Sequence, residues 1–271
     1  MKQSFLALAL LSLAAISPRP PGADPELFRN TDPVRQRDPA RAIVFQGRGV
    51  ELVNAGKYEA AVEQFRRAAA YDPLNANPLV NMAFCLDKLR RYEQAIEELK
   101  HAERLAPANA TIFLNWGNSL INLRKFEDAI VPLQKAVDLD SSNQLARLNL
   151  AAAYTNLGRH KEAADELARA AAVDPNSPTI YFNWAVVLST LGENAQAVEK
   201  YERVMALDPK NLSAYFSCAA LLEKMGRLDA AAEKIEAAIK VEPSNTLLQE
   251  ILIKLRQAAQ KRATNSTSGK Q

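Results

Sequence analysis

A spacing of 34 residues recurs along this chain and limits what it can fold into. Five prolines mark this spacing, and each lies 34 or 68 residues after the one before it: Pro73, Pro107, Pro175, Pro209 and Pro243. Ser141 takes the remaining place, so the register continues there without a proline. A constant period of this length indicates one small structural unit stacked on copies of itself, rather than a single compact core.

Six units without insertion or deletion account for most of the sequence. Their boundaries are 42–75, 76–109, 110–143, 144–177, 178–211 and 212–245. The eighth residue of every unit is Gly or Ala: Gly49, Ala83, Gly117, Ala151, Ala185 and Ala219. The twentieth residue is alanine in all six: Ala61, Ala95, Ala129, Ala163, Ala197 and Ala231. Small side chains at two fixed offsets predict two helices that approach each other closely within each unit.

Turn signals separate the two predicted helices. Four units carry glycine at the turn, at Gly56, Gly158, Gly192 and Gly226, and the proline near the end of each unit stops the second helix. Arg90 and Arg124 replace the turn glycine in two units. Pro132 falls inside the second helix of the third unit, where it should kink the helix or cost up to ~3 kcal/mol.

This pattern resembles the tetratricopeptide family over residues 42–245. The shared features are the small eighth and twentieth residues, the aromatic or apolar fourth residue, the late proline and the period itself. Arg48 departs from the family pattern at a position that is normally apolar. The resemblance implies an all-α fold, a right-handed α-solenoid of six helix-turn-helix repeats, whose function is to hold other proteins.

The sequence after the sixth unit predicts a cap for the solenoid. Apolar residues recur at helical spacing over 246–262, with polar residues on the other side, as an end helix exposed to water requires. The segment 263–271 has no apolar pattern and is expected to be a disordered tail.

The N-terminal segment 1–17 has the pattern of a signal peptide, with one lysine followed by a short apolar run. Its cleavage site is not defined by the sequence. Residues 18–41 are rich in proline and are expected to form an extended linker. We therefore expect an exported protein, periplasmic or secreted; the alternative is a cytoplasmic protein with an apolar N-terminal stretch.

Composition argues against several functions. The 34 basic and 31 acidic residues are interleaved along the chain, without the basic surface that nucleic-acid binding requires. No later segment is apolar enough for an integral membrane span. His101 and His160 do not lie beside a candidate nucleophile, and Cys85 and Cys218 are too far apart in the array to form a disulfide. We expect no enzyme activity, no catalytic residue, no metal site, no cofactor and no small-molecule substrate.

The candidate binding site is the surface formed by the first helices, because stacked repeats use such surfaces for binding. The sixth residue is asparagine in four consecutive units: Asn81, Asn115, Asn149 and Asn183. Amides can donate to and accept from the backbone of an extended peptide. The row resembles the asparagine ladder in the tetratricopeptide arm of O-linked N-acetylglucosamine transferases. Neighbouring candidates for peptide binding are Phe84, Leu114, Asn118, Leu148, Phe182, Val186 and Phe216.

Two interpretations of these residues remain open. The asparagines could be tolerated polar residues on an open face, and some of the apolar residues could pack between helices. The expected function is an exported module that binds an extended segment of a protein partner. Two alternatives are a structural scaffold in an envelope secretion, polysaccharide-export or pilus assembly, and an accessory subunit of a separate enzyme.

Overall fold

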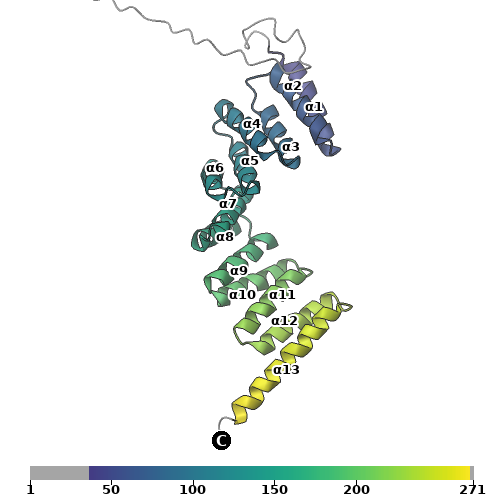
Figure 1. Ribbon diagram of the computed structural model, residues 1–271, viewed down its shortest axis with the longest axis vertical. Helices are drawn as coiled ribbons and strands as arrows, with labels where there is room; N and C mark the ends of the chain where they lie inside the picture. The colour runs from purple at the N-terminus through teal and green to yellow at the C-terminus, as the bar shows by residue number, and fades with distance from the viewer. Residues whose placement is uncertain (1–36, 269–271) are drawn as a thin grey trace, which may run out of the picture.

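The computed structural model describes the backbone of residues 37–268 and the side chains of residues 37–262, which form thirteen helices and no strand. The helices follow one another along an elongated stack (Figure 1). Their bounds are α1 Pro39–Asn54, α2 Tyr58–Tyr71, α3 Asn77–Lys88, α4 Tyr92–Leu105, α5 Ala110–Asn122, α6 Phe126–Leu139, α7 Gln144–Asn156, α8 His160–Val173, α9 Pro178–Leu191, α10 Asn194–Leu207, α11 Leu212–Lys224, α12 Leu228–Val241 and α13 Thr246–Ser268.

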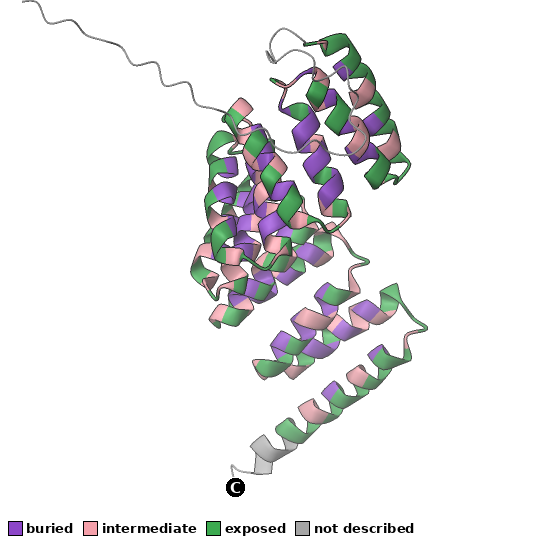
Figure 2. Cartoon of the chain, turned by 45° about the horizontal axis from the view of Figure 1, so that its top comes forward, coloured by how far each residue is buried: buried purple, intermediate pink, exposed green. Residues whose placement is uncertain are grey.

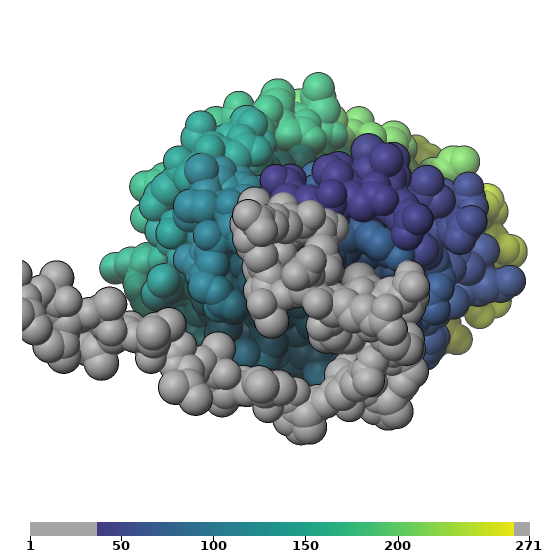
Figure 3. All heavy atoms as spheres, turned by 90° about the horizontal axis from the view of Figure 1, so that it is seen from above, coloured from purple at the N-terminus to yellow at the C-terminus, as the bar shows by residue number. Residues whose placement is uncertain are grey.

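Each helix packs mainly on the helices before and after it in sequence, which confirms the predicted all-α solenoid of six hairpins. The odd-numbered helices α1 to α11 are called the first helices of the repeats, and the even-numbered helices α2 to α12 the second helices. First helices of neighbouring repeats also touch, as α5 does with both α3 and α7. Seen from above, the repeats follow an arc, so the stack bends into a superhelix (Figure 3).

The core is a series of small clusters between consecutive helices, and buried residues therefore occur in every repeat (Figure 2). The alanines at the twentieth position are fully buried in all six repeats. At the eighth position of the first and third repeats, a Cβ on Gly49 or Gly117 would overlap the side chain of Phe65 or Leu133. Small residues at these positions let the paired helices come together, as their spacing predicted.

The turn between the two helices forms in the same way whether glycine or arginine occupies it. Gly158 and Gly192 have positive φ angles of 74° and 81°. Arg90 and Arg124 adopt the same left-handed conformation, with φ of 60° and 59°. A non-glycine residue in this conformation costs about 1–2 kcal/mol, so the second and third repeats keep the hairpin geometry despite their sequence.

Pro132 does not interrupt its helix. Helix α6 continues from Phe126 to Leu139 with Pro132 buried in its interior. Proline has no N–H to donate to the carbonyl of Asp128, four residues earlier, so one helical hydrogen bond is absent. The helix therefore continues through Pro132 at the cost of that hydrogen bond.

Both ends of the array extend further than the sequence predicted. Helix α1 begins at Pro39, inside the expected linker, because Asp38 caps it by accepting a hydrogen bond from the Arg41 backbone N–H at 3.0 Å. Proline is well tolerated at the first position of a helix. Helix α13 continues to Ser268, so most of the expected tail is helical.

The predicted signal peptide 1–17 and most of the linker, residues 18–36, lie outside the described residues. Over the part of the chain that the structure describes, no helix is both long and apolar enough to cross a bilayer.

Candidate functional site

The four asparagines occupy the sixth place on α3, α5, α7 and α9. Asn81, Asn115 and Asn149 are half buried, whereas Asn183 is exposed. None of the four side-chain amides makes a hydrogen bond to another group among the described residues. Their hydrogen-bonding capacity is therefore available to a ligand.

The six predicted apolar neighbours divide into two groups. Phe84 and Val186 are 39% and 40% exposed. The other four are half buried and pack partly against the helix clusters: Leu114, Leu148, Phe182 and Phe216. Phe182 also makes an edge-to-face contact with Tyr201, with ring centroids 5.6 Å apart. The interpretation that some of these residues pack between helices therefore applies to the second group.

Two hollows lie on the first-helix surface, one on each side of Asn183. The first has a volume of about 180 Å³ between α7 and α9, and Leu148 and Val186 line it together with Asn183. The second, of about 260 Å³, lies between α9 and α11 and is lined by Phe182 as well as Asn183. The structure thus brings Leu148, Phe182, Asn183 and Val186 together around adjacent hollows. The remaining predicted residues do not line these two hollows.

Asn118 has an internal partner, unlike the four asparagines of the row. Its amide donates to the carboxylate of Asp87 at 3.3 Å, and the Ser119 hydroxyl donates to the same carboxylate at 2.8 Å. Burial raises the pKa of Asp87, and the two hydrogen bonds oppose that effect. This cluster joins α3 to α5, so Asn118 has a structural role in holding neighbouring first helices together.

Four large, exposed apolar residues of the first helices were missed by the sequence reasoning: Ile43, Val44, Val50 and Leu145. Ile43 and Leu145, at the second position of their repeats, are 68% and 55% exposed, and Val50 is exposed at the ninth position. Phe84 and Val186 occupy that same ninth position in other repeats. Reading the ninth position across repeats would have found Val50, since this position carries a large apolar side chain in three of the six units.

The histidines and cysteines offer no evident chemistry. His101 is exposed. His160 is half buried, and its Nδ1 is buried without a hydrogen-bond partner within the described residues. Cys85 and Cys218 are buried and unpaired. Residues 37–262 contain no group of His, Cys, Asp and Glu side chains that could hold a metal ion.

Burial raises the pKa of both thiols to about 11, because the thiolate loses its hydration in the core. At pH 7.5 we therefore expect Cys85 and Cys218 to react with a water-soluble disulfide reagent only after the repeats unfold. Absorbance of the released thiol in native buffer and in denaturant measures this. Rapid reaction of either cysteine in the native protein would contradict the burial described here.

An ion pair lies unexpectedly in the interior of the fourth repeat. The Arg147 guanidinium contacts the Glu166 carboxylate at 3.0 Å, and their side chains are only 10% and 6% exposed. Arg169 donates to the second oxygen of Glu166 at 2.6 Å. Glu166 is therefore a buried carboxylate, whereas the neighbouring Asp165 is exposed.

The architecture defines the class of this protein: an α-solenoid of helical hairpins with an open surface along its first helices. The family model described as a tetratricopeptide repeat matches residues 52–112 and 120–181, and a model described as a TPR repeat matches residues 187–226. The chain belongs to the tetratricopeptide repeat family, and it is a protein–protein interaction module. Compared by sequence, no curated protein matches it.

Solved structures show the same fold at low sequence identity. PilF of Pseudomonas aeruginosa is 19% identical with a TM-score of 0.64, covering 79% of this chain and 98% of that one. YrrB, described as a TPR protein with an unusual peptide-binding site, is 22% identical with a TM-score of 0.60, covering 70% and 97%. MamA from Desulfovibrio magneticus RS-1 is 18% identical with a TM-score of 0.59, covering 63% and 97%.

Proposed function

We propose that this protein binds an extended segment of a partner protein along its first-helix surface. The observation that carries the proposal is the position of Asn183, whose unbonded, exposed amide lies between two hollows. The first hollow is lined mainly by apolar side chains, and the second combines Phe182 with polar residues. An amide there can bond the backbone of a passing segment, while the hollows receive its side chains.

The repeat spacing extends this arrangement to neighbouring first helices. Asn115 and Asn149 occupy the equivalent place on α5 and α7, and their amides are also free of internal hydrogen bonds within the described chain. Backbone contacts of this kind do not depend on the ligand's sequence. Preference among ligands then comes from the apolar side chains beside the row, such as Leu148 and Val186.

We place this binding outside the cytoplasm, as the pattern of residues 1–17 favours export. In that setting the protein acts as an adaptor that presents or retains its partner. The proposal requires no reaction on the chain itself.

Simultaneous replacement of Asn115, Asn149 and Asn183 by alanine is expected to weaken partner binding by at least about tenfold, since each lost hydrogen bond contributes roughly 0.5–1.5 kcal/mol. The helices should remain, because these side chains have no internal partners within residues 37–262. Affinity for the captured partner, measured by calorimetry beside circular dichroism of the fold, checks both expectations.

The matched control replaces three exposed acidic residues of second helices by alanine: Glu59, Asp165 and Glu233. This control should bind the partner as the parent protein does. Unchanged affinity in the asparagine triple variant, with the fold intact, would refute peptide binding by the row.

A further inference from the structure

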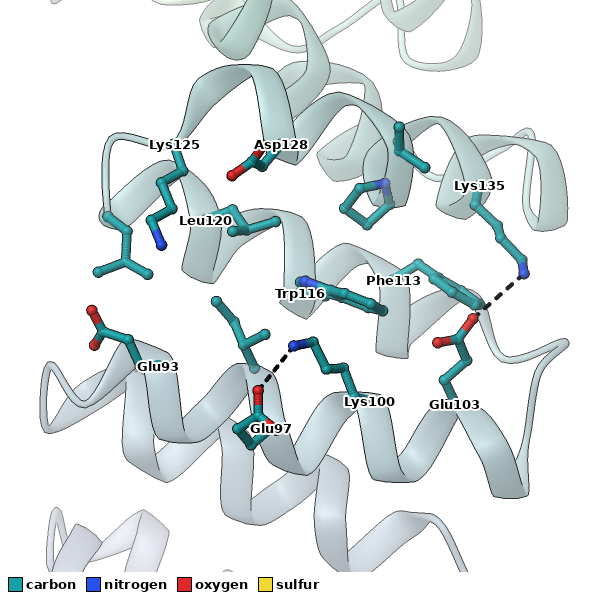
Figure 4. A pocket seen from close by; sticks show the side chains of 14 residues that line it. Glu93, Glu97, Lys100, Glu103, Phe113, Trp116, Leu120, Lys125, Asp128 and Lys135 are labelled. Atoms are coloured by element: carbon teal, nitrogen blue, oxygen red, sulfur yellow. Dashed lines mark hydrogen bonds and ion pairs between the residues drawn. The ribbon is translucent and has the colours of Figure 1, made fainter.

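A larger hollow opens between the second helices α4 and α6, apart from the two hollows beside Asn183. Its volume is about 530 Å³, within the range of sites that hold small ligands or partner side chains. Helix α5 forms the floor, where the indole of Trp116 lies in the middle between the two second helices (Figure 4). Ile96, Leu120 and Pro132 supply further apolar surface.

The fifth repeat shows how this chain covers a tryptophan at the same place. Trp184 is the seventh residue of its unit, as Trp116 is of the third. The Lys200 ammonium lies 4.5 Å from the centre of the Trp184 ring, an arrangement favoured by the negative face of the indole. Lys200 is the twenty-third residue of the fifth unit, and the twenty-third residue of the third unit is Pro132.

A second pair of positions shows that the two repeats are built alike. The Lys135 ammonium lies 4.5 Å from the centre of the Phe113 ring, and the Arg203 guanidinium lies 5.7 Å from that of Tyr181. Each aromatic ring is the fourth residue of its unit and each cation the twenty-sixth. The two repeats therefore pack alike, and the third has no cation over its tryptophan because Pro132 stands where the fifth has Lys200.

Charged side chains surround the hollow, and some of them already form ion pairs with each other. Lys100 is bonded to Glu97 at 2.9 Å, and Lys135 contacts Glu103 at 3.7 Å, both drawn as dashed lines in Figure 4. These pairs leave neither lysine free to cover Trp116. Over the described residues, no cation lies above the Trp116 ring at the distance seen for Lys200.

Two carboxylates remain available at the other end of the hollow. Glu93 and Asp128 lie in the first turns of α4 and α6, and neither makes an ion pair or side-chain hydrogen bond within the described chain. The one unpaired base there is Lys125, so the free rim carries more negative than positive charge. A positive group that entered over Trp116 would meet both an aromatic face and an excess of carboxylate.

We propose that the hollow between α4 and α6 binds a lysine or arginine side chain presented by a segment of a partner protein. This side chain takes the place that Lys200 fills in the fifth repeat. The apolar floor receives the aliphatic stem of the side chain, and its charge faces Glu93 and Asp128. This site is separate from the asparagine row, so loss of one does not remove the other.

The test uses the full chain labelled with ¹⁵N, in which the two indole N–H signals report Trp116 and Trp184 separately. The probe is a blocked pentapeptide with lysine between two leucines, compared with the same peptide carrying uncharged norleucine. We expect saturable shifts of the Trp116 signal, with about fivefold weaker binding of the norleucine peptide. The Trp184 signal should not move.

Two variants at one position supply the control. Pro132→Ala leaves the hollow open and should bind the lysine peptide, whereas Pro132→Lys supplies an internal ammonium and should abolish binding. The asparagine triple variant should bind it normally. The proposal would be overturned if the Trp116 signal did not respond, or if the norleucine peptide bound as tightly as the lysine peptide. It would also be overturned if Pro132→Lys bound the lysine peptide normally, or if free lysine amide bound as tightly as the peptide.

Discussion

Replacement of Glu166 by alanine is expected to lower the free energy of unfolding by about 3–5 kcal/mol, the largest effect anticipated for a single charged residue here. The change leaves Arg147 almost buried without its carboxylate partner. The carbonyl of Ser141, 3.0 Å from the guanidinium, then remains as an acceptor but carries no formal charge. Denaturant unfolding followed by circular dichroism measures the loss.

Two further variants separate the ion pair from simple truncation. Asp165→Ala removes an exposed carboxylate from the same helix and should have little effect. Arg147→Tyr combined with Glu166→Gln restores residue types found at the same positions elsewhere, at Tyr181 and Gln64, and should recover much of the stability. A loss below about 1 kcal/mol in Glu166→Ala would show that the pair is not buried as described.

Replacement of Pro132 by alanine is expected to raise the free energy of unfolding by about 2–3 kcal/mol. The new residue can donate its N–H to the carbonyl of Asp128 in the middle of α6, and alanine favours the helix. Part of the gain is offset because proline restricts the unfolded chain. The same denaturant experiment gives the change in stability.

The control for Pro132→Ala is an alanine substitution at the neighbouring position. Val131 is adjacent and strongly exposed, so Val131→Ala should change stability little. Equal or lower stability of Pro132→Ala would indicate that α6 tolerates the missing hydrogen bond without cost. The use of a costly residue at this place would then need no functional explanation.

The repeat period predicted the fold because each hairpin depends on local spacing. Ala61 and its equivalents are buried in every repeat, and the turn residues adopt left-handed conformations where the pattern placed them. Arg90 and Arg124 show the strength of this register, since stacking on neighbours maintains their turns despite the conformational cost. The ends were less predictable, since Pro39 is compatible with either a linker or the first turn of a helix.

Interactions between side chains were harder to predict than the helices. Arg147 replaces an aromatic or leucine at the fourth position, and Glu166 lies at the twenty-third, a position that is polar in most units. Each residue alone suggests a surface charge, and only the packing of α7 on α8 brings them together. Pro132 was visible as an anomaly, but its consequence required knowledge that Lys200 covers Trp184.

The candidate peptide site was predicted by position rather than by contact. Spacing placed Asn183 and Val186 on one face of a helix, but it did not show that Leu148, from another repeat, lines the same hollow. It also did not show that Asn118 bonds Asp87, because that contact links helices 31 residues apart in sequence. Helical periodicity predicts which residues lie on one face of a helix. Which residues of different helices line the same hollow depends on how the repeats stack.

Photo-crosslinking in the producing cells tests the binding surface most directly. A photo-reactive residue replaces Asn183 on α9 in one variant and the exposed Asp165 on α8 in another. Peptide binding along the first helices predicts strong crosslinks from position 183 to one partner segment, and weak ones from position 165. Crosslinks mainly from position 165 would contradict the account and favour a scaffold that uses its second helices.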